Sequence, residues 1–104
     1  MGYRLMITGR AEELLDSLTC YLLFELGNEP AAVRLTDGVE GIYGRLEQNP
    51  LQFPVSCDGY LAKKGYREAL VPGMRYRVVF TVSEETVTVL GIFHQSEIFR
   101  GRLM

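Results

Sequence analysis

Apolar and polar side chains alternate along residues 75–83, and this alternation is the clearest structural signal in the chain. Every second position is apolar or aromatic, whereas the positions between them include arginine, threonine and serine. A period of two is typical of a β-strand that turns one face toward a core. After two glutamates, a second run rich in β-branched residues extends from Thr86 to His94. The two runs predict a β-hairpin, and residues 65–94 together predict three consecutive antiparallel strands.

The register of this hairpin decides which side chains share a face of the sheet. If the two glutamates alone form the turn, counting back along the ladder places Arg77 opposite Ile92. The same count places Arg75 opposite His94. Arg75, Arg77 and His94 would then lie on one face. A pair of glutamates lacks the Asn or Gly that tight turns prefer, and a single bulge residue would reverse this assignment.

The N-terminal half predicts one strand followed by two antiparallel helices. Residues 3–8 are short and apolar enough for a strand at the centre of the sheet or one position from it. Thr8 can cap a first helix that runs from Gly9 or Arg10 to Leu26, and a second helix extends from about Pro30 to Gln48. The expected apolar positions are Leu15, Leu18, Leu22 and Leu26 in the first helix, and Ala32, Leu35, Val39, Ile42 or Tyr43, and Leu46 in the second.

Three glycines, Gly38, Gly41 and Gly44, interrupt the second helix. Each costs about 1 kcal/mol relative to alanine in a helix interior, so a compensating role is expected. One interpretation is close backbone approach, either to the first helix or to another chain. The other is a weak helix that tertiary packing holds together.

Length and composition favour one compact domain over residues 1–104, with 47% hydrophobic residues. No apolar run approaches the ~18 residues that span a bilayer, and the N-terminus lacks a signal-peptide pattern. We therefore expect a cytoplasmic protein without a membrane partner. Cys20 and Cys57 predict free thiols, and a single histidine does not complete a metal site with them at a familiar spacing. Neither a metal nor a cofactor is expected.

The net charge of −2 conceals an uneven distribution of charge. Residues 1–49 hold four basic and eight acidic side chains, whereas residues 50–104 hold seven basic and five acidic ones. One interpretation is that a polyanion or acidic partner meets the strands. The other is that the helices simply carry solvated acids. An acidic protein is a weak nucleic-acid binder by charge alone.

The predicted order is β-α-α-β-β-β, an α+β domain in which a helical hairpin packs on a twisted, mainly antiparallel, four-stranded sheet. Residues 49–64, with two prolines and a Cys-Asp-Gly turn signal, predict an ordered or semi-ordered connection. The lone strand, the helical hairpin, and then Gly65-Tyr66-Arg67, residues 76–80, a two-acid turn and residues 88–94 resemble the RelE/ParE superfamily of toxins from bacterial type II toxin–antitoxin pairs. The resemblance covers almost the whole chain.

The resemblance implies a candidate catalytic site on the strands. Arg77 aligns with the strand arginine that RelE-like enzymes use at the scissile phosphate, and its planar, always-charged fork suits phosphate oxygens. Alternatively, Arg77 extends to a carboxylate such as that of Glu68. His94 is the only side chain here whose ordinary pKa suits proton transfer near neutrality. It could instead cap its strand through a backbone hydrogen bond.

The remaining candidates are basic or aromatic. The resemblance implies that Arg67 assists Arg77 at the phosphate and that Lys63 and Lys64 line the RNA cleft, although these cations could also form a solvated loop. Where the best-known RelE-like enzymes carry a tyrosine in the C-terminal tail, this chain has Phe99, which can stack on a base but cannot transfer a proton. The candidate RNA-binding residues are Lys63, Lys64, Arg75, Phe99 and Arg100.

The resemblance leaves three functions open. The first is a metal-independent endoribonuclease that cleaves mRNA on the ribosome, with the ribosome and mRNA as partners. The second is a ParE-like protein that is not an enzyme but binds DNA gyrase through the helical hairpin and the C-terminal tail and inhibits it. The acidic first half of the chain and the missing tyrosine favour this second function. The third is a degenerate relative that binds only an antitoxin. All three imply a cognate antitoxin as partner, and a homodimer is also compatible with the sequence.

Overall fold

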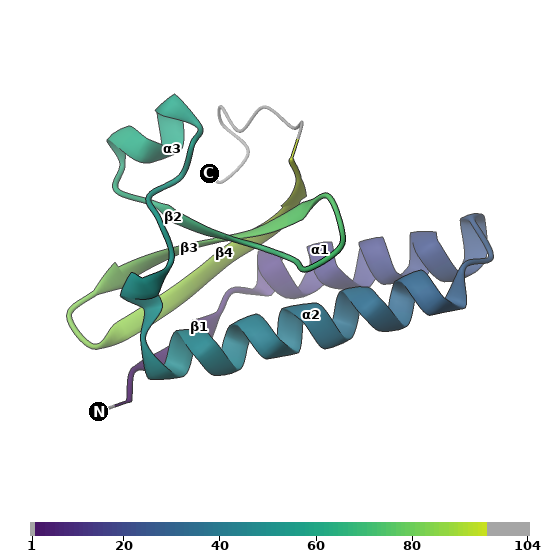
Figure 1. Cartoon of the computed structure of the whole chain (residues 1–104), viewed down its shortest axis with the longest axis horizontal. Coiled ribbons are helices and arrows are strands. Elements are labelled where there is room, and N and C mark those ends of the chain that lie inside the picture. Colours follow the sequence, from purple (N-terminus) through teal and green to yellow (C-terminus); the bar gives the residue numbers. More distant parts are fainter. Residues whose placement is uncertain (1, 96–104) are drawn as a thin grey trace.

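The computed structural model describes residues 2–95. Two long helices lie side by side along one face of a four-stranded sheet, and a short helix lies on the other side of it (Figure 1). This arrangement confirms the predicted order β-α-α-β-β-β and adds α3, which the sequence pattern did not predict. The elements are β1 (Arg4–Ile7), α1 (Gly9–Cys20), the π-helix η1 (Tyr21–Glu25), α2 (Glu29–Gln48), the 3-10 helix η2 (Pro50–Gln52), α3 (Gly59–Lys63), β2 (Arg67–Leu70), β3 (Tyr76–Ser83) and β4 (Thr86–His94).

Side-chain caps fix where the helices begin. The hydroxyl oxygen of Thr8 accepts a hydrogen bond from the Ala11 N–H at 3.1 Å, as predicted for the start of α1. The side-chain oxygen of Asn28 accepts in the same way from the Ala31 N–H at 3.1 Å, at the start of α2. Between these helices Gly27 adopts a φ of 58°, a left-handed conformation that glycine reaches at little cost. The connection between the two helices is therefore short and well defined.

The strands follow the order β1-β4-β3-β2 across the sheet. Strand β3 pairs with both β4 and β2 in an antiparallel orientation, whereas β1 pairs with β4 in a parallel orientation. β1 therefore lies at an edge, and the expectation of a buried position at or near the centre is wrong. Met6 and Ile7 are exposed as a result. A four-residue apolar run does not distinguish an edge strand from a central one, because its pairing partners lie far away in sequence.

Apolar side chains gather on both faces of the sheet. The main core lies between the sheet and the two long helices, and the predicted apolar positions of α2 all contribute to it. A smaller core lies on the opposite face, where Leu61 of α3 packs against Val79 and Phe93. Strand β3 thus sends Val78 and Phe80 into one core and Val79 into the other, as the alternation of a buried strand requires. The sheet is covered on both sides near its centre.

The first helix departs from its predicted pattern at its C-terminal end. Leu22 is buried, but Leu26, which a simple helical spacing places on the same face, is 55% exposed. The chain winds as a π-helix from Tyr21 to Glu25, and this wider turn changes the direction of the side chains that follow. The apolar line of the first helix therefore ends at Leu22.

The glycines of α2 do not share one role. A Cβ atom at Gly38 would lie 2.7 Å from Cγ1 of Val71, in the connection between β2 and β3. A Cβ atom at Gly41 or Gly44 would meet no described atom within 4 Å. Among these three glycines only Gly38 is closely packed, and its neighbour is the Val71 side chain rather than the first helix that the prediction named.

This difference predicts opposite effects of two alanine substitutions. Gly41→Ala should raise the free energy of unfolding by about 0.5–1 kcal/mol, because alanine loses less conformational entropy in a helix. Gly38→Ala should lower it by about 1 kcal/mol, because the buried, β-branched Val71 cannot yield without strain. Urea denaturation of the two variants measures both effects. Equal stabilisation by the two substitutions would contradict the close contact with Val71.

Because of Tyr43 in α2, the free energy of unfolding should change with pH in the alkaline range. Burial against the main core, with a smaller contribution from the Glu12 carboxylate, raises the pKa of Tyr43 from 10.0 to about 12. Because the folded state holds this proton more tightly, its stabilising effect is complete below pH 10 and is lost as the pH rises from 10 through 12. Tyr43→Phe should therefore show a shallower loss of stability between pH 9 and about pH 11, by at most about 1 kcal/mol after allowance for solvent screening.

The matched control for this effect is Tyr21→Phe, because Tyr21 is exposed. Urea midpoints for the parent and the two variants at both pH values provide the measurement. The Tyr21 variant should lose stability as steeply as the parent. If the Tyr43 variant does so too, the raised pKa of Tyr43 has no role in alkaline unfolding.

Both cysteines are free and exposed, as predicted. No helix among residues 2–95 is both long and apolar enough to cross a membrane. Over the same residues, no three side chains of the metal-binding types His, Cys, Asp and Glu come together in a group that could hold a metal ion.

Candidate functional site

Arg77, the strand arginine singled out by the sequence, lies in a buried ion pair. It points to the α3 side of the sheet, where Glu68 on the neighbouring strand β2 lies diagonally across from it. Nη1 of Arg77 donates to Oε1 of Glu68 at 2.8 Å, and each residue is only 6% exposed. Two opposite charges removed from water must be well paired, because desolvation of either charge alone is costly.

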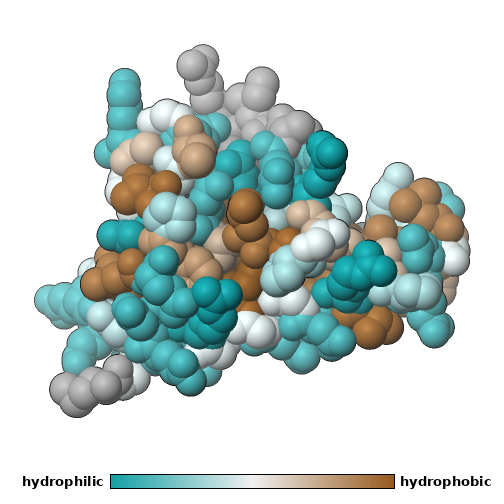
Figure 2. Space-filling view, viewed as in Figure 1, coloured by the Kyte–Doolittle hydropathy of each residue, from teal (hydrophilic) through white to brown (hydrophobic). Residues whose placement is uncertain are grey.

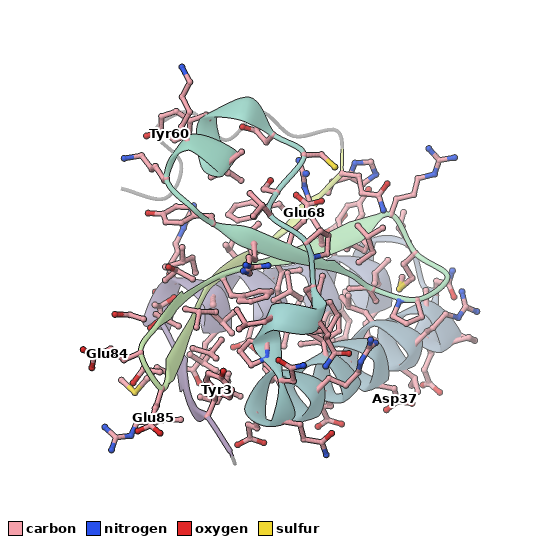
Figure 3. All side chains as sticks on the ribbon, turned by 60° about the vertical axis from the view of Figure 1, so that its left-hand side comes forward. Tyr3, Asp37, Tyr60, Glu68, Glu84 and Glu85 are labelled. Carbon is pink, nitrogen blue, oxygen red and sulfur yellow. The ribbon has the colours of Figure 1, made fainter. Side chains whose placement is uncertain are left out.

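The segment between η2 and α3 closes over this ion pair. The hydroxyl of Ser56 donates to the same Glu68 oxygen at 2.6 Å, and the Cys57 N–H donates to it at 3.3 Å. Nη2 of Arg77 donates to the backbone carbonyl of Gln95 at 3.3 Å. Figure 3 places Glu68 between the sheet and the segment that leads to α3. The guanidinium group is therefore held inside the protein, as in the alternative that pairs Arg77 with Glu68.

The register of the β3–β4 hairpin separates Arg77 from His94. The ladder shifts between Val79 and Phe80, so that Arg77 pairs with Phe93 and Tyr76 pairs with His94. The rings of Tyr76 and His94 meet edge to face, with centroids 5.7 Å apart. Residues that pair directly share a face, and neighbouring residues of one strand point to opposite faces. The prediction that Arg75, Arg77 and His94 share one face is therefore wrong for Arg77 and His94.

Arg67 is also separated from Arg77 by the sheet. It pairs directly with Phe80, whose ring belongs to the main core on the helix side. Nη1 of Arg67 donates to the backbone carbonyl of Phe53 at 2.6 Å. Arg67 thus anchors the segment that follows η2, and the two arginines proposed to hold one phosphate point to opposite faces of the sheet.

The other predicted RNA-binding residues are dispersed. Lys63 and Lys64 are exposed at the end of α3, and Nζ of Lys64 lies 5.4 Å from the centre of the Tyr60 ring. Arg75 is exposed just before β3. Phe99 and Arg100 lie outside the described residues. The structure thus leaves Lys63 and Lys64 together on the surface, but it does not bring them together with Arg67 and Arg77 into one cation cluster.

Metal-free RNA cleavage requires cations at the phosphate and proton-transfer groups on either side of it. Arg77, Arg67 and His94 do not meet that requirement as a group, because they occupy different faces of the sheet. Ser56 was not recognised from the sequence, although its hydroxyl completes the buried network. A serine before the Cys-Asp-Gly turn gave no signal, since such residues are common in turns for local reasons.

A family described as the ParE toxin of the type II toxin–antitoxin system, parDE, matches residues 5–99. The chain belongs to the ParE toxin family. The match extends over nearly the entire chain, which confirms the resemblance to the RelE/ParE superfamily. No curated protein sequence matches significantly.

Two solved structures have the same fold as this ParE-family toxin. The chromosomal ParDE toxin–antitoxin system from P. aeruginosa matches with a TM-score of 0.70 and 18% identity, covering 88% of this chain and 95% of that chain. The RelBE2 toxin–antitoxin complex from Mycobacterium tuberculosis matches with a TM-score of 0.62 and 25% identity, covering 93% and 95%. The two structures represent both named branches of the superfamily, so the fold alone does not separate gyrase inhibition from RNA cleavage.

Proposed function

We propose that this type II toxin acts by binding DNA gyrase and inhibiting it, rather than by cleaving mRNA on the ribosome. The observation that carries the proposal is the buried ion pair between Arg77 and Glu68. An arginine that must neutralise a buried carboxylate is not available to a phosphate without leaving that carboxylate unpaired. The proposal thus replaces the nuclease as the preferred function and takes up the ParE-like alternative.

Two further observations support the gyrase proposal. The matching family is that of ParE toxins, and the resemblance implies gyrase binding for ParE-like members. In addition, the net charge is −2, and residues 9–48 hold eight acidic and three basic side chains. Proteins that grip RNA depend on neutralising phosphates with lysine and arginine. A protein target is compatible with this charge distribution, and ribosomal RNA is a poor match to it.

We also propose that a cognate antitoxin binds this chain and silences it. The two similar structures are of a toxin–antitoxin system and a toxin–antitoxin complex, and the family is named for such a pair. Antitoxins of this kind commonly order a flexible segment on binding, which allows a small protein to cover a large surface. The antitoxin therefore supplies a specific reversal control for any assay of the toxin.

The test compares two activities of one protein preparation. Purified toxin is incubated with gyrase, ATP and relaxed plasmid, and in parallel with translating ribosomes and a reporter mRNA whose 5′ ends are mapped. We expect supercoiling to stop in the first assay, with reversal by the antitoxin encoded beside the toxin, and no new mRNA ends in the second. Ribosome-dependent cleavage together with unaffected supercoiling would overturn the proposal and restore the nuclease.

A further inference from the structure

The outer end of the helical hairpin carries exposed apolar side chains that the fold does not use. We call residues 20–29 the hairpin tip; they comprise the end of α1, the π-helix η1 and the start of α2. Tyr21 is 48% exposed, Phe24 78% and Leu26 55%. In Figure 1 the hairpin extends beyond the sheet, and Figure 2 shows apolar side chains at its outer end. Scattered exposed apolar residues are ordinary, but three within six residues on a protruding element form a patch.

The backbone of the tip is held by contacts that do not involve the Phe24 side chain. Leu22 anchors it in the main core, the Leu26 N–H donates to the Tyr21 carbonyl at 3.0 Å, and the Asn28 N–H donates to the Leu22 carbonyl at 2.8 Å. These contacts hold the backbone while the Phe24 ring stays in solvent. A protruding aromatic side chain on a held backbone has only two side-chain torsions to fix, so it loses little entropy on binding. Short π-helical turns are also frequent at functional sites.

Beside Phe24 lies an open hollow that adds shape to the patch. Its volume is about 360 Å³, and it is lined by Ser17, Cys20, Tyr21, Phe24 and Glu25. A partner side chain could enter the hollow while Phe24 enters a recess on the partner. The tip therefore offers both a projection and a depression, as a specific protein interface requires.

The charge around the tip indicates which surface it fits. Residues 11–33 contain five acidic side chains and no lysine or arginine. Three of the acids, Asp16, Glu25 and Glu29, lie within or next to the tip. An apolar centre surrounded by carboxylates is complementary to an apolar recess rimmed by lysine or arginine, and such complementarity accelerates encounter and selects the partner.

Resting on the proposed function, we infer that the hairpin tip is the surface with which the toxin holds gyrase, through a recess rimmed by basic residues. Phe24 and Tyr21 supply the apolar contact, and Glu25 and its acidic neighbours supply the charged rim. The interaction should weaken as the salt concentration rises, because salt shortens the Debye length, about 8 Å at physiological ionic strength, and exposed charges farther apart than this length are largely screened.

The test measures gyrase binding by biolayer interferometry for the full chain and two tip variants, Phe24→Ser and Glu25→Lys. Phe24→Ser should weaken binding by about 10- to 100-fold, as loss of a central aromatic anchor does. Glu25→Lys should mainly slow association and reduce its dependence on salt. The matched controls are Leu51→Ser and Glu40→Lys. Leu51 is 53% exposed and follows the far end of α2, and Glu40 is an exposed acid beyond the tip.

The outcomes distinguish an error in the surface assignment from an error in the proposed function. If the parent binds gyrase and the tip variants bind as tightly as the controls, the hairpin-tip assignment is overturned while the gyrase proposal stands. If the parent does not bind gyrase at all, the proposed function fails, and this assignment fails with it. If the tip variants no longer bind the antitoxin but bind gyrase as tightly as the parent, the tip is an antitoxin surface and the assignment to gyrase is wrong.

Discussion

Replacing Glu68 by alanine is expected to lower the free energy of unfolding by about 3–5 kcal/mol, the usual cost of leaving a buried charge without its partner. Oε1 of Glu68 accepts hydrogen bonds from Arg77 at 2.8 Å, from Ser56 at 2.6 Å and from the Cys57 N–H at 3.3 Å. The substitution removes this shared acceptor at once. The guanidinium of Arg77, only 6% exposed, would then remain without its carboxylate in a site that excludes water.

Urea denaturation followed by circular dichroism measures this loss. The matched control is Glu40→Ala on the exposed surface of α2, which should change the free energy of unfolding by less than about 0.5 kcal/mol. A cost below about 1 kcal/mol for Glu68→Ala would place the pair in the range of solvent-exposed salt bridges and contradict its structural role.

Phe80→Ala is expected to have a similarly large effect, about 3–5 kcal/mol, because it removes a large ring from the main core. Phe80 is fully buried, and its ring meets that of Phe53 edge to face with centroids 5.9 Å apart. The Arg45 guanidinium lies over the outer Phe53 ring, 4.7 Å from its centre. The substitution therefore leaves a cavity where strand β3 supports the segment after α2.

Phe24→Ala provides the control for Phe80→Ala, because the same side chain is removed from a position that is 78% exposed. We expect its effect on the unfolding free energy to remain below about 0.5 kcal/mol. The measurement is the midpoint of thermal unfolding for both variants, which compares the loss of stability at the two positions. Comparable losses of stability at the two sites would contradict the role of Phe80 as a central side chain of the main core.

The long elements could be predicted because each satisfies one strong period. The apolar line of the second helix and the alternation along β3 lead to the correct elements, and Thr8 marks the start of the first helix. Such signals act within a few residues, where local geometry decides the outcome. The order of the strands in the sheet was harder to predict from the sequence. β1 pairs with β4, some eighty residues later, and nothing local to β1 marks it as an edge.

The predicted site was wrong because the register of the β3–β4 hairpin differs by one residue from the register that the prediction assumed. β4 contains an extra residue, Leu90, between the partners of Val79 and Phe80, and this bulge moves His94 to the face opposite Arg77. Gly91 was the available signal, because a glycine inside a strand often marks a bulge. A side chain does not fit at this position, because a Cβ atom at Gly91 would lie 2.6 Å from the Phe93 ring. Periodicity alone does not detect such a shift.

The sequence alone does not decide whether Arg77 is buried. An arginine between apolar neighbours fits both a phosphate site and an internal ion pair. The choice depends on whether Glu68 lies on the same face, which follows from the β2–β3 register. It also depends on closure by the segment that carries Ser56, and that segment has no periodic pattern.

The most direct test of the central claim replaces the whole ion pair rather than one partner. Arg77→Met combined with Glu68→Leu removes both buried charges, and such apolar replacements are often neutral or stabilising when the volume is preserved. The measurement is the concentration of folded double variant that halves gyrase supercoiling. We predict a value within about 3-fold of the parent, that is, a change of less than about 0.7 kcal/mol in apparent binding free energy. A folded double variant that no longer inhibits gyrase would contradict the claim that Arg77 serves the fold and not the activity.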